Sequence, residues 1–126
     1  RNAIDFGDLS LALTSWNSAG GCGDLVFNDI HRAKGKLSCM KDILTEADIA
    51  LFQESHADTL EQQYFEEQWS QSHLNFWAHG ERRNRGGLIT SIKRSWAKHL
   101  DMLFSVVIEP GRCLATFCIS KGLVVV

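Results

Sequence analysis

Hydrophobic and polar residues follow one another along this chain in patterns that predict strands and helices in turn. Leucines alternate with small or polar residues over residues 8–16, which indicates a strand with one apolar face. Residues 49–52 form an unbroken apolar run that ends in polar residues, and such a run is typical of a strand buried on both faces in a parallel sheet. Between these strands, apolar residues recur every three or four positions. They predict an amphipathic helix over about residues 28–46, with Asn28 or Asp29 as its N-cap.

The order strand, helix, strand predicts a βαβ unit over residues 8–54. The crossover in such a unit makes the two strands parallel, so Asn17 and Glu54 should follow neighbouring strands at the same edge of the sheet, about 5 Å apart. Open α/β sheets bind ligands outside the carboxyl ends of their strands. An amide beside a carboxylate suits a hard cation and a polar substrate, so Asn17 and Glu54 are the candidate site residues.

The rest of the chain is predicted to add one helix and several strands. The helix is expected over 58–71, with Leu60, Tyr64, Phe65 and Trp69 as its apolar residues, and strands are expected at 74–78, 88–92, 100–108, 113–119 and 123–126. Pro110 and Gly111 occupy the central positions of a type II turn. No internal repeat or linker interrupts the sequence, so residues 1–126 are expected to belong to a single domain.

Composition narrows the class of protein. Hydrophobic residues make up 44% of the sequence and charged residues 22%, so the chain can bury a core and is not disordered. The net charge of −2 gives no overall basic field, so any contact with nucleic acid must come from local basic patches. No apolar run reaches the length of a membrane span and the first residues do not form a signal peptide. We therefore expect an intracellular protein, nuclear or cytoplasmic, with no membrane contact.

The cysteines are Cys22, Cys39, Cys113 and Cys118, and no pair has CxxC spacing. Cys39 and Cys118 fall in segments with apolar periodicity. We interpret the cysteines as reduced and mostly buried thiols, neither a zinc site nor a disulfide framework. A Cys113–Cys118 disulfide is the alternative.

Several motifs, in their order along the chain, resemble the endonuclease/exonuclease/phosphatase superfamily. They are a strand ending in Ser15-Trp16-Asn17, a glycine-rich loop, the run DIALFQESH at 48–56, an RGGLI segment at 85–89 and a Pro-Gly-Arg turn at 110–112. The chain is most similar to apurinic and retroelement-encoded endonucleases. The resemblance covers nearly all 126 residues but only the N-terminal half of a family domain. The chain also lacks an initiator methionine and stops within an apolar run, so a truncated DNase-I-like α/β sandwich is expected, as a single incomplete domain.

This resemblance implies metal-dependent hydrolysis of phosphodiester bonds, with DNA as the partner of the parent protein. It implies that Asn17 helps to hold the substrate phosphate and the metal, and that Glu54 is a ligand of Mg²⁺, for which Mn²⁺ could substitute. His56 and Arg85 are further candidates for substrate contact, each with a plain surface-loop role as the alternative. The family's remaining catalytic motifs lie downstream of the segment present here, so this chain alone is expected to be inactive.

Two alternatives to a DNA endonuclease stay open. The first keeps the fold and the metal but acts on inositol phosphates or lipid headgroups. The second is a non-catalytic remnant or a protein-interaction module. The sequence does not indicate an oligomeric state.

The other conspicuous residues have simpler interpretations. Arg82 and Arg83 could follow a nucleic-acid backbone or belong to a charged surface loop. Arg112 is assigned to a turn or to the surface, and Trp16 to core packing rather than base stacking. Gly86-Gly87 is assigned to a bulge or to close packing.

Overall fold

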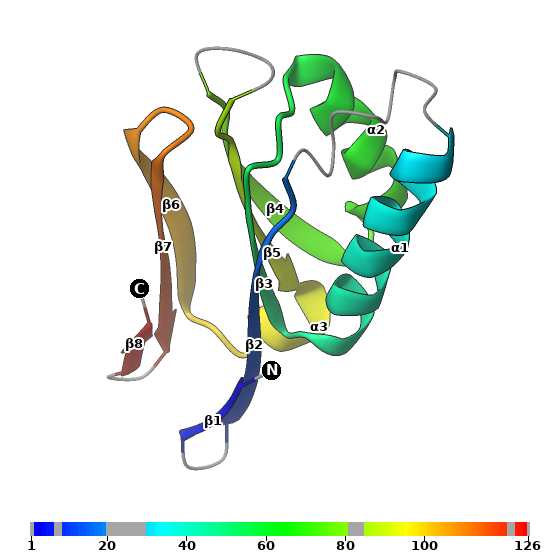
Figure 1. Ribbon diagram of the computed structural model, residues 1–126. Coiled ribbons are helices and arrows are strands. Elements are labelled where there is room, and N and C mark those ends of the chain that lie inside the picture. The colour runs from blue at the N-terminus through cyan, green and yellow to red at the C-terminus, as the bar shows by residue number, and fades with distance from the viewer. Residues whose placement is uncertain (1, 7–8, 20–29, 81–84, 121–122, 126) are drawn as a thin grey trace.

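Helices and two sheets form three layers in the part of the chain that the structure describes (Figure 1). The computed structural model describes residues 2–6, 9–19, 30–80, 85–120 and 123–125. Helices α1 (Ile30–Glu46) and α2 (Thr59–Trp69) lie on one face of a five-stranded sheet, and a three-stranded sheet faces its other side. The architecture is α/β, which confirms the class predicted from the sequence.

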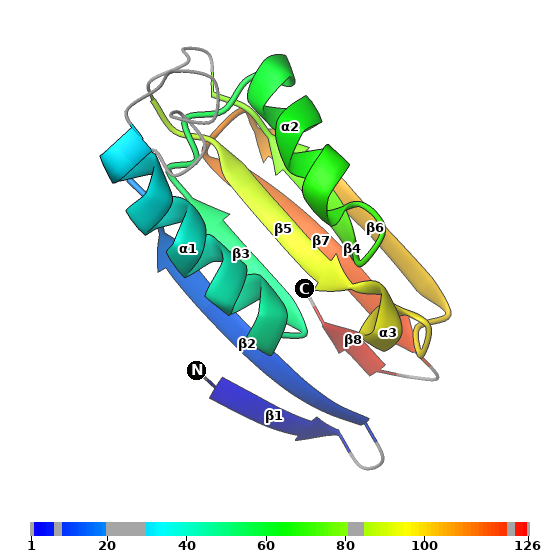
Figure 2. The same cartoon turned by 90° about the vertical axis from the view of Figure 1, so that its right-hand side faces the viewer.

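The five-stranded sheet has the order β1-β2-β3-β5-β4. Its strands are β1 (Asn2–Phe6), β2 (Leu9–Asn17), β3 (Ile49–Gln53), β4 (His73–Ala78) and β5 (Leu88–Lys93). β2 and β3 are parallel neighbours joined through α1, which confirms the predicted βαβ unit (Figure 2). The other pairs are antiparallel, so the expectation of a parallel sheet is wrong beyond this pair. β3 is buried because the helices cover one of its faces and the second sheet covers the other. Its burial therefore does not require that its neighbours be parallel.

Asp48, the acidic residue that opens the central run, fixes the start of the parallel pair. Its Oδ2 accepts a hydrogen bond from the backbone N–H of Ala12 at 2.8 Å, and its own N–H donates to the Ala12 carbonyl at 2.8 Å. On the other side, Lys93 donates its backbone N–H to the Asp48 carbonyl at 2.9 Å. Asp48 therefore ties three strands together at the end of the sheet opposite Glu54.

The second sheet consists of β6 (Met102–Glu109), β7 (Cys113–Ser120) and β8 (Leu123–Val125), all antiparallel. The turn between β6 and β7 is the predicted one. Gly111 has a φ of +69°, which a type II turn requires at its third position, and Arg112 N–H donates to the Glu109 carbonyl at 3.1 Å. This turn lies at the same end of the molecule as the carboxyl end of β3 (Figure 1).

The alternating apolar residues of β6 lie on the outer face of the second sheet. They are Met102, Phe104, Val106 and Ile108, which are between 39% and 64% exposed. Phe104 stacks on Phe117 of β7, with ring centroids 4.8 Å apart. Leu103, which lies between Met102 and Phe104 in the sequence, packs inward against the first sheet. The alternation correctly predicts a strand, but it does not identify which face is buried.

Two hydrophobic clusters hold the layers together. The cluster between the helices and the sheet contains Met40, Leu44, Ala47, Ala50, Phe52, Ala57, Phe65 and Ile89. The cluster between the sheets contains Leu11, Ile49, Ile92, Trp96 and Cys118. Trp96 belongs to α3 (Arg94–Ala97), a short helix that the sequence pattern did not reveal. Trp16 packs on the first cluster, edge-on to Phe52 at 6.3 Å between ring centroids, which supports its assignment to core packing.

Helix α2 begins with a capping box at Asp58. Its carboxylate accepts the Leu60 N–H at 3.0 Å, and Glu61 reaches back to the Asp58 N–H at 3.3 Å. Phe65 is buried as predicted, but Leu60 and Tyr64 are 43% and 45% exposed because the helix turns Glu61 and Phe65 toward the sheet instead. The proposed caps of α1 lie outside the described residues. None of the described helices is both long and apolar enough to cross a membrane.

The cysteines that the structure describes are free thiols, so no Cys113–Cys118 disulfide forms. The two residues project to opposite faces of β7 because five positions separate them. Cys118 is buried, and burial raises the pKa of its thiol. Cys39 and Cys113 are exposed, so the expectation of mostly buried thiols is wrong for them. Cys22 lies outside the described residues.

His73 on β4 is a buried histidine with a polar partner at each ring nitrogen. Its Nε2 lies 3.0 Å from the Leu44 carbonyl oxygen, and its Nδ1 lies 2.7 Å from Ser72 Oγ. Burial lowers the pKa of His73 below its ordinary value; the hydrogen bond to Leu44 opposes this shift, and the nearby positive charge of Lys93 adds to it.

We expect acid to destabilise the protein through His73. The unfolded chain takes up this proton near the ordinary histidine pKa of about 6.5, and the folded chain takes it up only at lower pH. The free energy of unfolding should therefore have its full value above about pH 6.5. It should decrease as the pH is lowered further, and His73 should account for at most about 1.4 kcal/mol per pH unit of this decrease. Urea unfolding across this range checks the slope. The slope should be smaller in His73→Gln and unchanged in His99→Gln, which alters an exposed histidine; equal slopes in the two variants would contradict the assignment.

Candidate functional site

The segment that follows β3 adopts an unusual backbone conformation. Glu54 has a φ of +55° and His56 a φ of +52°. These left-handed conformations are uncommon for residues other than glycine, and each costs about 1–2 kcal/mol. Such conformations persist only where the surrounding structure holds them, and they gather at functional sites. The segment Glu54-Ser55-His56 is called the Glu54 turn below.

Ser18, at the end of β2, holds the Glu54 turn from one side. Its Oγ donates to the carbonyl oxygens of Gln53 at 3.1 Å and Glu54 at 3.0 Å, and its N–H donates to the Gln53 carbonyl at 2.8 Å. Ser18 is buried, so water does not compete for these carbonyls. The sequence pattern did not identify Ser18 as a site residue. Only its position directly after Trp16-Asn17 could have indicated that it lies at the site.

The glycine pair before β5 holds the same turn from the other side. Ser55 N–H donates to the Gly87 carbonyl at 3.1 Å, and His56 N–H donates to the Gly86 carbonyl at 3.0 Å. Gly87 N–H in turn donates to the Gly111 carbonyl at 2.9 Å. Backbone hydrogen bonds thus connect the Glu54 turn, the glycine pair and the β6–β7 turn, which are far apart in the sequence.

Close contact with neighbouring atoms explains why these positions are glycine. At Gly87, with a φ of +96°, an added Cβ would lie 2.3 Å from Ser55 Oγ. At Gly86, with a φ of +65°, an added Cβ would lie 2.8 Å from the Gly111 carbonyl oxygen. Real Cβ atoms do not come this close to other heavy atoms, so the assignment of the glycine pair to close packing is confirmed. The same holds for Gly111, where an added Cβ would lie 2.3 Å from Gly80 Cα.

The carboxylate of Glu54 reaches solvent while one of its oxygens is held in place. Its side chain is 45% exposed, and its Oε2 lies 2.8 Å from His56 Nε2. His56 is 24% exposed, so it is neither a free surface-loop residue nor fully buried. The histidine fixes the direction in which the carboxylate points.

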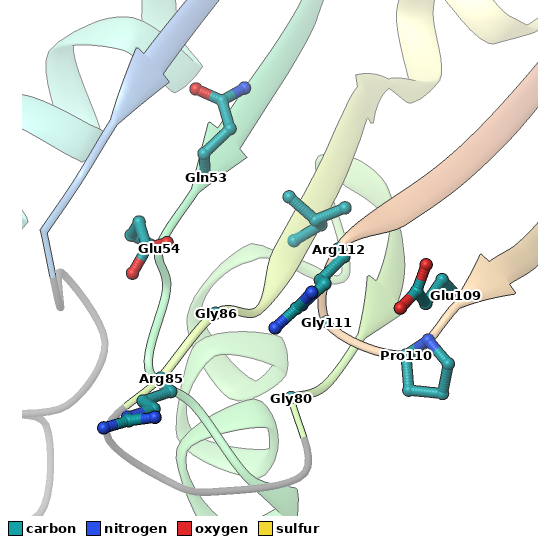
Figure 3. A pocket seen from close by; sticks show the side chains of 10 residues that line it. Gln53, Glu54, Gly80, Arg85, Gly86, Glu109, Pro110, Gly111 and Arg112 are labelled. Carbon is teal, nitrogen blue, oxygen red and sulfur yellow. The ribbon is translucent and has the colours of Figure 1, made fainter.

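Glu54 lines a hollow of about 760 Å³ between the two sheets' ends (Figure 3). The other lining residues are Gln53, Gly80, Arg85, Gly86, Leu88, Glu109, Pro110, Gly111 and Arg112. Arg85 and Arg112 bring positive charge to it, and Glu54 and Glu109 bring negative charge. The hollow is accordingly a polar depression lined by charges of both signs.

Asn17 is the last residue of β2 and lies beside the end of β3, as the sequence predicts. It is in register with Gln53, and residues in register on paired strands project to the same face, so Asn17 and Gln53 share a face. Asn17 is not among the residues that line the hollow. Its Oδ1 accepts the N–H of Ala19 at 3.0 Å, so in this structure the amide oxygen forms a hydrogen bond within the segment that follows β2.

Glu54 is the described residue best suited to anchor a hard cation. The described part of the chain contains no group of three or more histidine, cysteine or acidic residues that could hold a metal ion. Mg²⁺ takes one or two carboxylates and keeps several waters, so one exposed carboxylate at a polar hollow fits this ion as a single anchor. The part of Asn17 in such a site stays a prediction; its amide oxygen accepts the Ala19 N–H and keeps a second lone pair.

Some of the basic residues considered from the sequence lie at the hollow. Arg85 is exposed and lines the hollow, whereas Arg82, Arg83 and the glycine-rich loop lie outside the described residues. Lys36 of α1 donates its Nζ to the Ala19 carbonyl, just after β2. Arg112, assigned from the sequence to a turn or to the surface, also lines the hollow, and neither local pattern nor charge revealed this.

Comparisons with known proteins assign no family to the chain. It matches no protein-family model and no curated protein with which it was compared. The interpretation of the site therefore depends on its geometry and on the motifs in the sequence.

Proposed function

We propose that this chain carries part of a metal-dependent phosphodiesterase site of the endonuclease/exonuclease/phosphatase superfamily, on a DNase-I-like sandwich, with DNA as the substrate. The observation that carries the proposal is the Glu54 turn. Its carboxylate stands at the carboxyl end of β3, beside a polar hollow, on a strained backbone that hydrogen bonds hold from both sides. A strained backbone that presents an exposed carboxylate is typical of functional sites.

Each residue of the site has a distinct part in this proposal. Glu54 would anchor Mg²⁺ or Mn²⁺, and His56 keeps the carboxylate in position through its Nε2. When bound, the ion would neutralise charge on the phosphoryl oxygens and activate water. The amide of Asn17 can orient a phosphate without repelling it, because it is uncharged and can both donate and accept. Arg85 supplies positive charge at the rim of the hollow.

The experiment that tests the proposal measures binding of Mn²⁺, by electron paramagnetic resonance, to the chain and to Glu54→Gln. The substitution removes the charge but keeps the shape, so affinity should fall about tenfold or more. Glu67→Gln, an equal charge change at an exposed position of α2, should bind as the unchanged chain does. Circular dichroism checks that both variants fold. Equal affinity in Glu54→Gln and the unchanged chain would refute the metal site.

A further inference from the structure

We propose that Asn75 and Ser91 form a buried binding site for a water molecule, which bridges strands β4 and β5 beneath helix α2. The inference goes beyond the proposed function and does not depend on it, because neither residue lines the hollow at Glu54. Its tests require neither a metal ion nor DNA.

Asn75 and Ser91 project toward the helices from neighbouring strands. Asn75 alternates with Trp77 on β4, and Ser91 alternates with Ile89 on β5. Ile89 belongs to the cluster between the helices and the sheet, and Trp77 packs against that cluster. Side chains two positions apart on a strand project to the same face, so Asn75 and Ser91 also lie beneath the helix layer.

The polar atoms of both side chains are buried without a hydrogen-bond partner among the described residues. These atoms are Oδ1 and Nδ2 of Asn75 and Oγ of Ser91. Native structures satisfy the great majority of buried polar groups with protein atoms or with ordered water, because an unsatisfied group destabilises the fold. Three such atoms on two neighbouring residues therefore indicate a shared ligand.

Helix α2 supplies polar partners to two other side chains on this side of the sheet. Gln62 Oε1 lies 2.6 Å from His79 Nε2, just after β4. One turn further along the helix, Glu66 Oε1 accepts a hydrogen bond from Trp77 Nε1 at 2.9 Å. The partners advance along α2 as they recede along β4, so the helix runs antiparallel to the strand.

Aromatic side chains occupy the part of α2 that lies over Asn75. Trp69 is edge-on to His73, with ring centroids 5.7 Å apart, so Asn75 faces the stretch of α2 between the residues that contact His73 and Trp77. Phe65 lies in this stretch and contacts both Trp69 and Trp77, at 6.4 and 5.2 Å between ring centroids. Phe65 has no polar group, so the regular sequence of helix partners is interrupted at Asn75.

One water molecule fits the spacing of the two side chains. Asn75 and Ser91 are directly opposite each other in the antiparallel register, and the Cβ atoms of such residues are about 4.5–5.5 Å apart. A water that forms hydrogen bonds of about 2.8 Å to two groups spans about 4–5.5 Å between them. Water both donates and accepts hydrogen bonds, as do asparagine and serine, so one molecule can bond to both residues.

Burial and the absence of charge identify the ligand as water. Ser91 is 0% exposed, and Ala50, its neighbour in register on β3, is 1% exposed. Both side chains are small, whereas the next row toward the Glu54 turn carries Phe52 and Ile89. A buried ion would need charged partners, and Asn75 and Ser91 are uncharged. Buried water, in contrast, typically bonds to uncharged polar groups of this kind.

A crystal structure of the unchanged chain, at a resolution that shows ordered water, is the direct test. Electron density for a water within about 3.2 Å of both Asn75 and Ser91 Oγ is the expected result. A direct hydrogen bond between the two side chains would overturn the inference. So would an Asn75 amide turned onto the ring of Phe65 with no density between Asn75 and Ser91. This test needs no substitution and so does not depend on how a variant folds.

Urea unfolding of Ser91→Ala, Asn75→Leu and the double variant tests the bridge in solution. A shared water couples the two residues, so Ser91→Ala should lower the unfolding midpoint in the unchanged chain and have a much smaller effect when Asn75→Leu is already present. Two dry and independent polar groups would behave differently. Each apolar replacement would then leave the midpoint unchanged or raise it, and the two effects would add.

Ser95→Ala is the matched control, because it removes the same hydroxyl from an exposed position of α3. Its effect on the unfolding midpoint should be small and the same with and without Asn75→Leu. Additive effects of Ser91→Ala and Asn75→Leu, or coupling of Ser95→Ala to Asn75→Leu as strong as that of Ser91→Ala, would overturn the water bridge.

Discussion

Replacing Gly87 by alanine should destabilise the chain by about 2–5 kcal/mol and displace the Glu54 turn. The new Cβ would meet Ser55 Oγ at 2.3 Å and His56 N at 3.3 Å. Part of the cost, about 1–2 kcal/mol, comes from a φ of +96° that a side chain tolerates poorly, and the rest comes from overpacking of about 1–3 kcal/mol. Because Ser55 and His56 donate their N–H groups to the glycine pair, the position of Glu54 should change as well.

Urea unfolding of three variants checks this prediction. Gly87→Ala should show the full loss, and combining it with Ser55→Ala should recover only the overpacking part, since the strained φ remains. Gly35→Ala is the matched control, because Gly35 lies in α1 and an added Cβ meets nothing within 4 Å. It should be stabilising by up to about 1 kcal/mol. A Gly87→Ala variant as stable as the unchanged chain would show that the glycine contacts do not hold the turn.

Replacing Phe52 by alanine should cost about 3–5 kcal/mol, the range for a large aromatic residue removed from a core. Phe52 is 1% exposed and belongs to the cluster between the helices and the sheet. It directly precedes Gln53 on β3 and contacts Trp16 on β2 edge-on. The cavity would therefore open beneath both strand ends that carry the site, and Mn²⁺ binding should weaken together with stability.

The measurement is the free energy of unfolding of Phe52→Ala, Phe52→Leu and Tyr64→Ala. Phe52→Leu leaves a smaller cavity and should cost clearly less than Phe52→Ala. Tyr64 is 45% exposed on α2, so its removal should change stability by about 0.5 kcal/mol at most. If Phe52→Ala cost no more than Tyr64→Ala, the cluster would not support the strand ends.

The site was foreseen in part. Glu54 and Asn17 follow adjacent parallel strands as the βαβ pattern predicts, because a short crossover through one helix leaves few other arrangements. The pattern did not foresee that Asn17 turns its amide oxygen to Ala19, or that Glu54 takes a left-handed conformation. The first feature depends on a hydrogen bond between residues two positions apart, and the second on hydrogen bonds from Ser18 and with the glycine pair, which are distant in the sequence. Hydrophobic periodicity is insensitive to both.

The sequence by itself determined the helices α1 and α2, most strands and the Pro-Gly turn, because period, caps and turn residues act within a few positions. It did not determine which face of β6 is covered, since an alternating strand fits either way and only a neighbouring layer decides.

Tertiary structure alone joined the Glu54 turn to Gly86-Gly87 and to Gly111, and it brought Arg112 to the hollow. Hydrophobic attraction is non-directional and specifies that residues are buried without specifying their neighbours. Packing of the two sheets selects those neighbours, and with them the residues that share a site.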